Sequence, residues 1–173
     1  MKKKTRQIAF GGILTALSVA VLWIGSTLPG YEIAVAAMAG LIPAAAVVRG
    51  GVGDGLTVYG ASSLLALVLL PHKIPALWYL VIFGYYGAVK SLAERAPGRI
   101  LEWIIKVLTY TLAFFVLYLL LHDAFAALTD LIPLGILPVY WIGLVVFCVY
   151  DIGFSRLIGL YLRRIDRNLG KGA

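Results

Sequence analysis

Six long apolar runs, separated by short polar segments, constrain the fold of this chain more than any other feature of its sequence. A transmembrane helix needs about 20 apolar residues to cross a hydrocarbon core of about 30 Å. Runs suited to this can be drawn over residues 8–28, 33–48, 56–70, 76–89, 103–121 and 135–154. Apolar and aromatic residues make up 62% of the chain and charged residues 13%, against roughly 45–50% and about 25% in soluble domains. We therefore predict an all-α integral membrane protein, in which residues 1–173 form one transmembrane domain of six helices.

The second, third and fourth runs are shorter than the others. They are bounded by Pro and Gly residues at positions 29–30, 50–51, 71 and 75, which are typical of turns and helix ends. Such a run is accommodated by a locally thinned bilayer, by neighbouring helices, or by crossing only part of the membrane, which makes a re-entrant second or third segment an alternative. The Gly-rich stretch 50–55 is expected to make a tight turn between the second and third helices.

The basic residues lie between the apolar runs. There are 15 Lys and Arg residues against 8 Asp and Glu residues, for a net charge of +7. With six crossings, fourteen of the fifteen basic residues fall on the side of the two termini, and only Lys73 falls on the other side. Cytoplasmic loops are enriched in Lys and Arg, so we predict a multi-pass cell-membrane protein with both termini cytoplasmic and a basic cytoplasmic tail over 155–173. This charge distribution indicates a membrane topology and no nucleic-acid partner.

The first helix carries a face of small residues. Gly12, Ala16 and Ala20 follow one another at intervals of four, and therefore lie on one side of a helix. Small side chains allow another transmembrane helix to approach closely. The face is predicted either to dock a partner protein or to pack against another helix of the same chain.

Polar and aromatic residues collect in the loops on the side opposite the termini and at the helix ends beside them. The candidate substrate-binding residues of this group are Tyr31, Glu32, His72, Trp78, Tyr79, His122, Asp123, Tyr140 and Trp141. Trp and Tyr at this depth are also typical of an interfacial belt. Glu32 either favours the N-terminus of a helix or hydrogen-bonds a polar group of a ligand in an outward pocket.

Catalytic and metal motifs are missing from the sequence. His72, His122 and Asp123 do not fall into a His-Glu-x-x-His or Gly-x-Ser-x-Gly pattern, and the single cysteine, Cys148, makes neither a disulfide nor a cysteine metal site. The glycines at 50–55 lack the lysine of a phosphate-binding loop. We therefore expect no enzyme activity, no metal and no cofactor, and any energy for transport must come from a partner.

Asp151 is the one acidic residue inside the last apolar run. An ionisable side chain at membrane depth is costly unless it is paired. Asp151 is predicted to lie in the cytoplasmic half of the membrane, where it pairs with Lys106 or Arg156 or meets a partner protein.

These features together resemble the substrate-binding S component of energy-coupling factor (ECF) transporters. The resemblance rests on the short chain, the six spans with both termini inside, the basic start and the small-residue first helix, residues 9–20, AFGGILTALSVA. It implies an S-component-like bundle that captures a small, vitamin-like molecule outside the cell, in a pocket formed by the outer loops. It also implies that Gly12, Ala16 and Ala20 dock on a transmembrane scaffold subunit coupled to two ATPases, which drive release inside.

Two other functions use the same features. A non-transport membrane scaffold, such as a small subunit of the rod-shape and cell-wall machinery, would use the same small-residue faces, and its outer aromatic residues would form a belt. An intramembrane enzyme that uses Asp151 or the two histidines is the third possibility, and it predicts that Asp151→Asn abolishes turnover.

Overall fold

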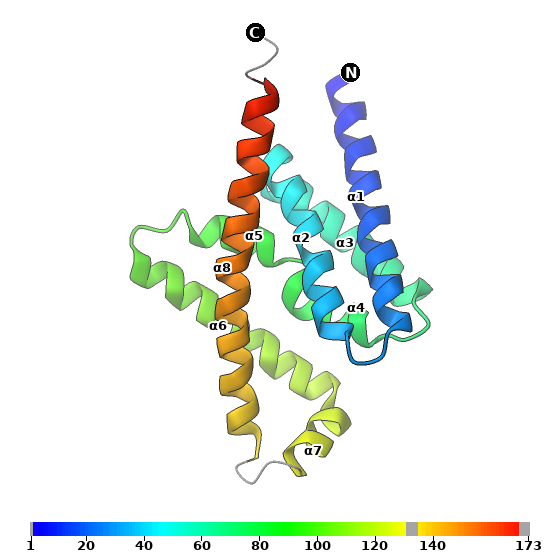
Figure 1. Cartoon of the computed structure of the whole chain (residues 1–173), viewed down its shortest axis with the longest axis vertical. Helices are drawn as coiled ribbons and strands as arrows, with labels where there is room; N and C mark the ends of the chain where they lie inside the picture. Colours follow the sequence, from blue (N-terminus) through cyan, green and yellow to red (C-terminus); the bar gives the residue numbers. More distant parts are fainter. Residues whose placement is uncertain (1, 131–134, 170–173) are drawn as a thin grey trace. The chain divides into compact units, whose positions relative to one another are not determined.

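The computed structural model describes residues 2–130 and 135–169, and the described backbone is helical apart from short turns. Side chains are described for residues 4–126 and 135–160. The elements, in chain order, are α1 (Lys2–Thr27), α2 (Glu32–Gly50), α3 (Val52–Leu69), α4 (Ile74–Trp78), the π-helix η1 (Tyr79–Phe83), α5 (Tyr86–Ala93), α6 (Arg99–Leu120), α7 (His122–Asp130) and α8 (Ile136–Leu169). They form two compact units, Met1–His122 and Asp123–Ala173 (Figure 1).

Six of the described helical segments are long and apolar enough to cross a membrane. They cover Lys4–Thr27, Glu32–Gly50, Val52–Leu69, Ile74–Ala93, Arg99–Leu120 and Ile136–Leu160. The prediction of a helical membrane protein with six candidate spans is therefore confirmed. The three segments that look short in the sequence are helical over 19, 18 and 20 residues. The second continues past Arg49, the third begins at Val52, ahead of its apolar run, and the fourth begins at Ile74 and continues past Lys90.

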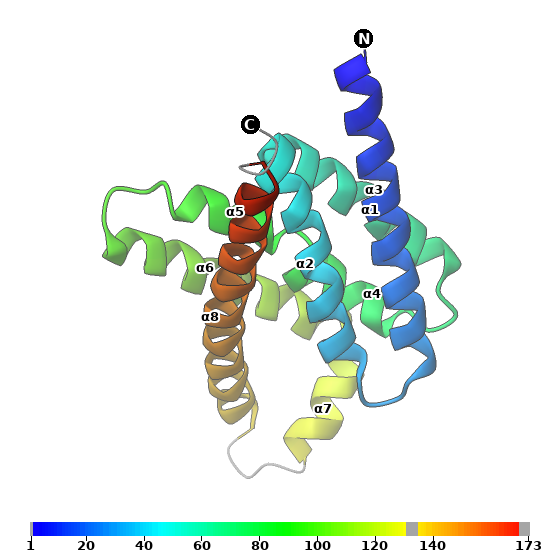
Figure 2. The same cartoon turned by 45° about the horizontal axis from the view of Figure 1, so that its top comes forward.

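Helices α1, α2 and α3 pack against one another at the start of the first unit, and this arrangement is visible in two views (Figures 1 and 2). The turn between α1 and α2 contains Gly30, whose φ is +86°, a value that favours glycine. The turn between α2 and α3 is confined to Gly51, with φ +91°, because α3 already begins at Val52. The rest of the Gly-rich stretch is helical rather than part of the turn.

The fourth span, made of α4, η1 and α5, is the most enclosed element. In its apolar window 61% of the residues are buried, against at most 33% in each of the other spans. Helix α2 contacts all three of its parts. The contact is closest at Gly40, where an added Cβ would lie 2.6 Å from the carbonyl oxygen of Phe83. The π-helix, closed by a hydrogen bond from the Gly84 amide to the Tyr79 carbonyl (2.7 Å), thus forms the centre of the first unit.

Helix α6 completes the first unit and packs on α5 and η1. Lys90 near the end of α5 and Lys106 near the start of α6 are both buried. Each bonds a glutamate one turn away on its own helix: Lys90 Nζ lies 3.1 Å from Glu94, and Lys106 Nζ lies 2.6 Å from Glu102. These ion pairs make a buried lysine tolerable in each helix, because a buried charge with a hydrogen-bonded partner costs much less than an unpaired one.

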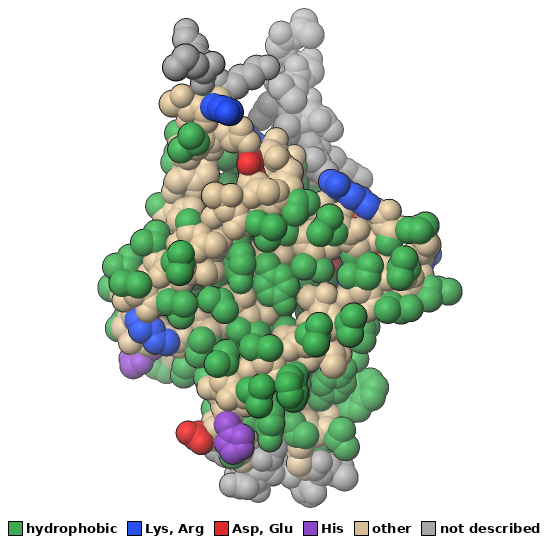
Figure 3. Space-filling model, turned by 180° about the vertical axis from the view of Figure 1, so that it is seen from behind, with side chains coloured by type: hydrophobic (Ala, Val, Ile, Leu, Met, Phe, Trp, Pro, Cys, Tyr) green, Lys and Arg blue, Asp and Glu red, His purple; other side chains and the backbone are tan. Residues whose placement is uncertain are grey.

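The second unit consists of the short helix α7 and the long helix α8. The sequence did not predict α7, which has only nine residues. Helix α8 extends to Leu169, so the residues expected to form the basic tail continue the last helix up to that point, and 170–173 lie outside the described residues. Hydrophobic side chains dominate the surface of the molecule in the view from behind (Figure 3), as expected for a protein whose solvent is lipid.

Candidate functional site

A small pocket lies at one end of the first unit, where α1 ends, α2 begins and the loop between α3 and α4 passes. Its volume is about 300 Å³. It is lined by Ser26, Thr27, Pro29, Glu32, Pro71, His72 and Ile74. We call this end of the unit, formed by residues 26–32 and 70–74, the pocket end.

Two proline-containing turns shape the pocket. Pro29 and Gly30 end α1 and turn the chain into α2. Pro71 ends α3, since the residue before a proline avoids helical backbone, and Leu70 accordingly has an extended ψ of 134°. Pro75 then opens α4, where a proline without an amide hydrogen is tolerated. Both turns therefore leave irregular backbone at the same end of three packed helices, which creates the hollow.

Glu32 carries the only formal charge among the residues that line the pocket. It is the first residue of α2 and is half-buried. Its carboxylate has no hydrogen bond or ion pair with any side chain or backbone group that the structure describes. The helix dipole favours an acidic residue at a helix N-terminus. This explains the position of Glu32 at the start of α2 without supplying a hydrogen-bond or ion-pair partner.

Lys73, which follows His72 in the sequence, is held at the end of α3. Its ammonium donates hydrogen bonds to the carbonyls of Leu70 (2.6 Å) and Val68 (3.3 Å), groups that a helix C-terminus leaves unpaired. Lys73 does not line the pocket. Its positive charge therefore stabilises a helix end and leaves the Glu32 carboxylate available.

The two hydroxyl groups of the pocket, those of Ser26 and Thr27, can only accept hydrogen bonds from a ligand, because each donates its own hydrogen to the backbone. Ser26 Oγ donates to the Trp23 carbonyl (2.7 Å), and Thr27 Oγ1 donates to the Ile24 carbonyl (2.8 Å). Each hydroxyl has one hydrogen and two acceptor lone pairs, so only the acceptor side remains for a ligand. The sequence reasoning missed both residues, since Ser and Thr in membrane helices usually bond their own backbone, as these two do.

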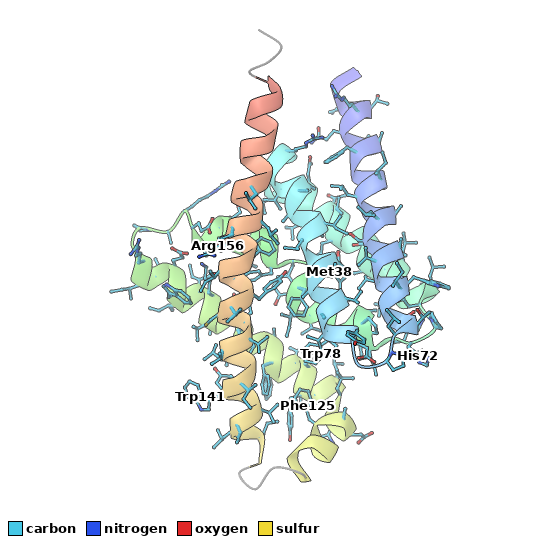
Figure 4. All side chains as sticks on the ribbon, viewed as in Figure 1. Met38, His72, Trp78, Phe125, Trp141 and Arg156 are labelled. Carbon is cyan, nitrogen blue, oxygen red and sulfur yellow. The ribbon has the colours of Figure 1, made fainter. Side chains whose placement is uncertain are left out.

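Among the candidate residues of the sequence, the structure brings Glu32 and His72 together in this pocket. His72 is exposed in the loop after α3 (Figure 4). Tyr31, which precedes Glu32 in the sequence, is 64% exposed and does not line the pocket. Trp78 is half-buried on α4 and does not line it either. Tyr79 is fully buried in η1, and its hydroxyl lies 2.7 Å from Ser62 Oγ.

The remaining candidates lie elsewhere in the chain. The His122 ring contacts the Tyr118 ring at the end of α6, with centroids 5.8 Å apart. Asp123, Tyr140 and Trp141 belong to the second unit, in which the rings of Tyr140 and Trp141 meet edge to face at 5.7 Å. Among the described residues, no three His, Cys, Asp or Glu side chains group closely enough to hold a metal ion.

The small-residue face of α1 points away from its neighbours in the described structure. Gly12, Ala16 and Ala20 are exposed, while Leu14, Ser18 and other residues of the opposite side are buried. A Cβ added at Gly12 would meet nothing within 4 Å. The face is therefore available to a partner helix.

Asp151 lies in α8 and is buried, with 4% of its surface exposed. Its backbone carbonyl accepts a hydrogen bond from the Ser155 hydroxyl (3.0 Å). Arg156, one of its two expected partners, is exposed on the same helix (Figure 4). Pairing of Asp151 with Lys106 or Arg156 stays a prediction.

A buried group of hydroxyls at the centre of the first unit was not predicted from the sequence. Tyr79 and Ser62 bond each other, and the Tyr59 hydroxyl donates to the Leu80 carbonyl (2.8 Å). The carbonyl of Leu80 lies inside the π-helix, where the wider turn leaves backbone groups for other donors. The only signal in the sequence is a Ser-Ser pair, 62–63, within an apolar run.

Comparison of the chain with protein-family models, with curated proteins and with solved structures finds no match.

Proposed function

We propose that the chain is a membrane-embedded substrate-binding subunit of the ECF S-component type, which captures a small molecule in the pocket at the pocket end. The observation that carries the proposal is the Glu32 carboxylate, half-buried and unpaired among the described residues in a pocket of about 300 Å³. Small-molecule sites are concave, mostly apolar and supplied with a few polar groups that orient the ligand. Pro29, Pro71 and Ile74 give this pocket its apolar walls.

The location of the pocket supports capture from outside the cell. The start of α1, the end of α2 and the start of α3 lie together, since Gln7 hydrogen-bonds Asp54 and the Arg49 guanidinium lies 4.5 Å from the Phe10 ring centre. We call this the basic end, because Lys4, Arg6 and Arg49 lie there. The pocket end is the opposite end of the same three helices. By the positive-inside tendency, the basic end faces the cytoplasm and the pocket faces out.

The exposed face of Gly12, Ala16 and Ala20 supports docking on a partner. In lipid, helices associate through close van der Waals contact, which small residues permit. We propose that this face binds a transmembrane scaffold subunit coupled to two ATPases, as in the family that the sequence resembles. Those ATPases supply the energy for release inside, and the chain itself carries out no chemistry.

Purification of the tagged chain from its native membrane tests the proposal, with the co-purifying proteins identified by mass spectrometry. We expect a transmembrane scaffold and two ATPases. Ala16→Trp should reduce their recovery by roughly tenfold or more, a loss of about 1.4 kcal/mol in binding free energy, because the large ring prevents close helix approach. Leu64→Trp, at a position of α3 that is 69% exposed, is the matched control and should leave recovery unchanged.

Two results would contradict the proposal. Recovery of cell-wall enzymes in place of ATPases would identify the chain as a membrane scaffold of the rod-shape type. Equal loss of the partners in Ala16→Trp and Leu64→Trp would show that the α1 face does not dock them.

A further inference from the structure

We propose that the pocket selects small organic cations that carry an N–H-bearing ammonium group, an inference that rests on the binding function proposed above. The charge of the pocket is the first argument. Of the seven residues that line it, Glu32 alone carries a formal charge, and that charge has no partner among the described residues. A ligand with one positive charge would neutralise it and form a charge-assisted hydrogen bond, which is about twice as strong as a neutral one.

The hydrogen-bonding capacity of the lining is the second argument. Ser26 and Thr27 have already given their hydroxyl hydrogens to the carbonyls of Trp23 and Ile24. What they present to the pocket is oxygen lone pairs, and the Glu32 carboxylate likewise only accepts. His72, the fourth polar side chain of the lining, has one ring N–H donor and one acceptor nitrogen when it is neutral, so acceptors outnumber donors in the lining. A ligand rich in acceptors would therefore leave these oxygens unpaired, whereas an ammonium group with two or three N–H donors would pair them.

The position of Lys73 is the third argument. A lysine or arginine side chain in the pocket would neutralise the charge of the Glu32 carboxylate, and the pocket would then favour neutral or anionic ligands. The only Lys or Arg residue predicted on this side of the membrane is Lys73, and its ammonium is bound to the carbonyls of Leu70 and Val68. The α3 C-terminus thus binds the one Lys or Arg side chain expected at this end, and neither a lysine nor an arginine lines the pocket beside Glu32.

The size of the pocket limits the ligand. A volume of about 300 Å³ is at the lower limit of the range for ligand pockets, ~300–1,000 Å³. The apolar part of the lining consists of Pro29, Pro71 and Ile74. The expected ligand is therefore a compact molecule with one apolar part and one ammonium group, smaller than a typical dinucleotide or large cofactor.

A set of three probes of the same shape tests the charge selection: benzylamine, benzyl alcohol and benzoate. Binding to the full chain in nanodiscs is measured by ligand-observed NMR, and empty nanodiscs correct for partition into lipid. We expect benzylamine to bind at least roughly tenfold more tightly than benzyl alcohol, and benzoate to bind most weakly. Glu32→Gln should remove the preference for benzylamine, whereas Asp54→Asn, which neutralises a carboxylate at the basic end, should retain it.

The outcomes separate this inference from the proposed function. If benzyl alcohol or benzoate binds as tightly as benzylamine, the charge selection is overturned and a ligand pocket remains. The same follows if the preference for the cation survives in a Glu32→Gln variant that melts at the same temperature as the parent chain. Absence of binding by all three probes up to their solubility limit overturns both. Retained cation preference with no recovery of ATPases in the co-purification overturns the transporter assignment alone.

Discussion

At the scale of single residues, two buried serines of the first unit differ in the presence of a hydrogen-bond partner. Ser62 and Ser18 are both fully buried. Ser62 Oγ donates to the Val58 carbonyl (2.7 Å), so its single hydrogen is used, and the Tyr79 hydroxyl at 2.7 Å must donate to it. Ser18 Oγ lies near the Tyr79 hydroxyl but makes no hydrogen bond of ordinary geometry among the described residues. The energetic value of a buried hydroxyl is therefore set by its partner, since a buried group left unpaired costs free energy.

Removal of each hydroxyl tests this difference. Ser62→Ala should lower the free energy of unfolding by about 1–2 kcal/mol, because the buried Tyr79 hydroxyl loses its acceptor. Ser18→Ala should change it by less than about 0.5 kcal/mol, because no hydrogen bond is lost. Unfolding in mixed micelles with increasing SDS measures both values. A loss in Ser18→Ala as large as that in Ser62→Ala would mean that Ser18 takes part in the bonding at the centre of the unit.

The candidate site was predicted in part at this scale. Glu32 and His72 could be predicted because each is polar and lies beside a proline-containing turn between apolar runs. Tyr79 could not be placed correctly among the outer residues, because the sequence does not fix the rotation of the fourth helix, and the structure turns this side chain toward Ser62. Two candidate positions one residue apart, Trp78 and Tyr79, thus have different surroundings.

At the scale of elements, the packing of α2 on the π-helix depends on one glycine. The Cβ of an alanine at position 40 would lie 2.6 Å from the Phe83 carbonyl oxygen and 2.9 Å from the carbonyl carbon. Backbone atoms of a buried helix cannot move aside as the end of a flexible side chain can. The two segments must therefore separate to accept even one methyl group.

Gly40→Ala should accordingly lower the free energy of unfolding by about 1–3 kcal/mol, the usual cost of overpacking a core. Gly60→Ala is the control, since it adds the same methyl group within α3 at a place where nothing lies within 4 Å, and it should not destabilise the chain. Thermal melting of both variants in the same detergent checks the difference. Equal melting temperatures for the two variants would argue against close contact between α2 and η1.

The elements themselves were largely predictable. Apolar runs of sufficient length predict the six candidate spans, but not their ends. Helix α5 continues past Lys90, which is paired with Glu94, and α6 begins at Arg99, ahead of its apolar run. The π-helix was not predictable, since the residues Tyr79–Phe83 carry no local signal for it. Its position is associated with a contact to Gly40 that is distant in sequence, and windows of local sequence do not report such contacts.

At the scale of the whole molecule, the distribution of charge distinguishes the two ends of the first unit. The basic end carries Lys4, Arg6 and Arg49, and the pocket end carries Glu32 and Lys73. Lysine and arginine in short loops set the orientation of a membrane protein, whereas acidic residues contribute little. The excess of basic residues at one end therefore predicts which way the pocket faces, and capture of a ligand from outside depends on that orientation.

Labelling of single cysteines determines this orientation. Cys148 is the only cysteine, so Cys148→Ser gives a cysteine-free background. Two single cysteines are introduced into it separately: Tyr31→Cys at the pocket end, and Pro97→Cys in the exposed loop between α5 and α6. A maleimide that does not cross membranes should label Tyr31→Cys in intact cells, and Pro97→Cys only after the cells are permeabilised, because the positive charges of Arg95 and Arg99 favour the cytoplasmic side for that loop. The reverse pattern would place the Glu32 pocket on the cytoplasmic side, where a molecule captured outside could not reach it. Cation selection measured in nanodiscs would then still describe the pocket, but as a site for an intracellular ligand.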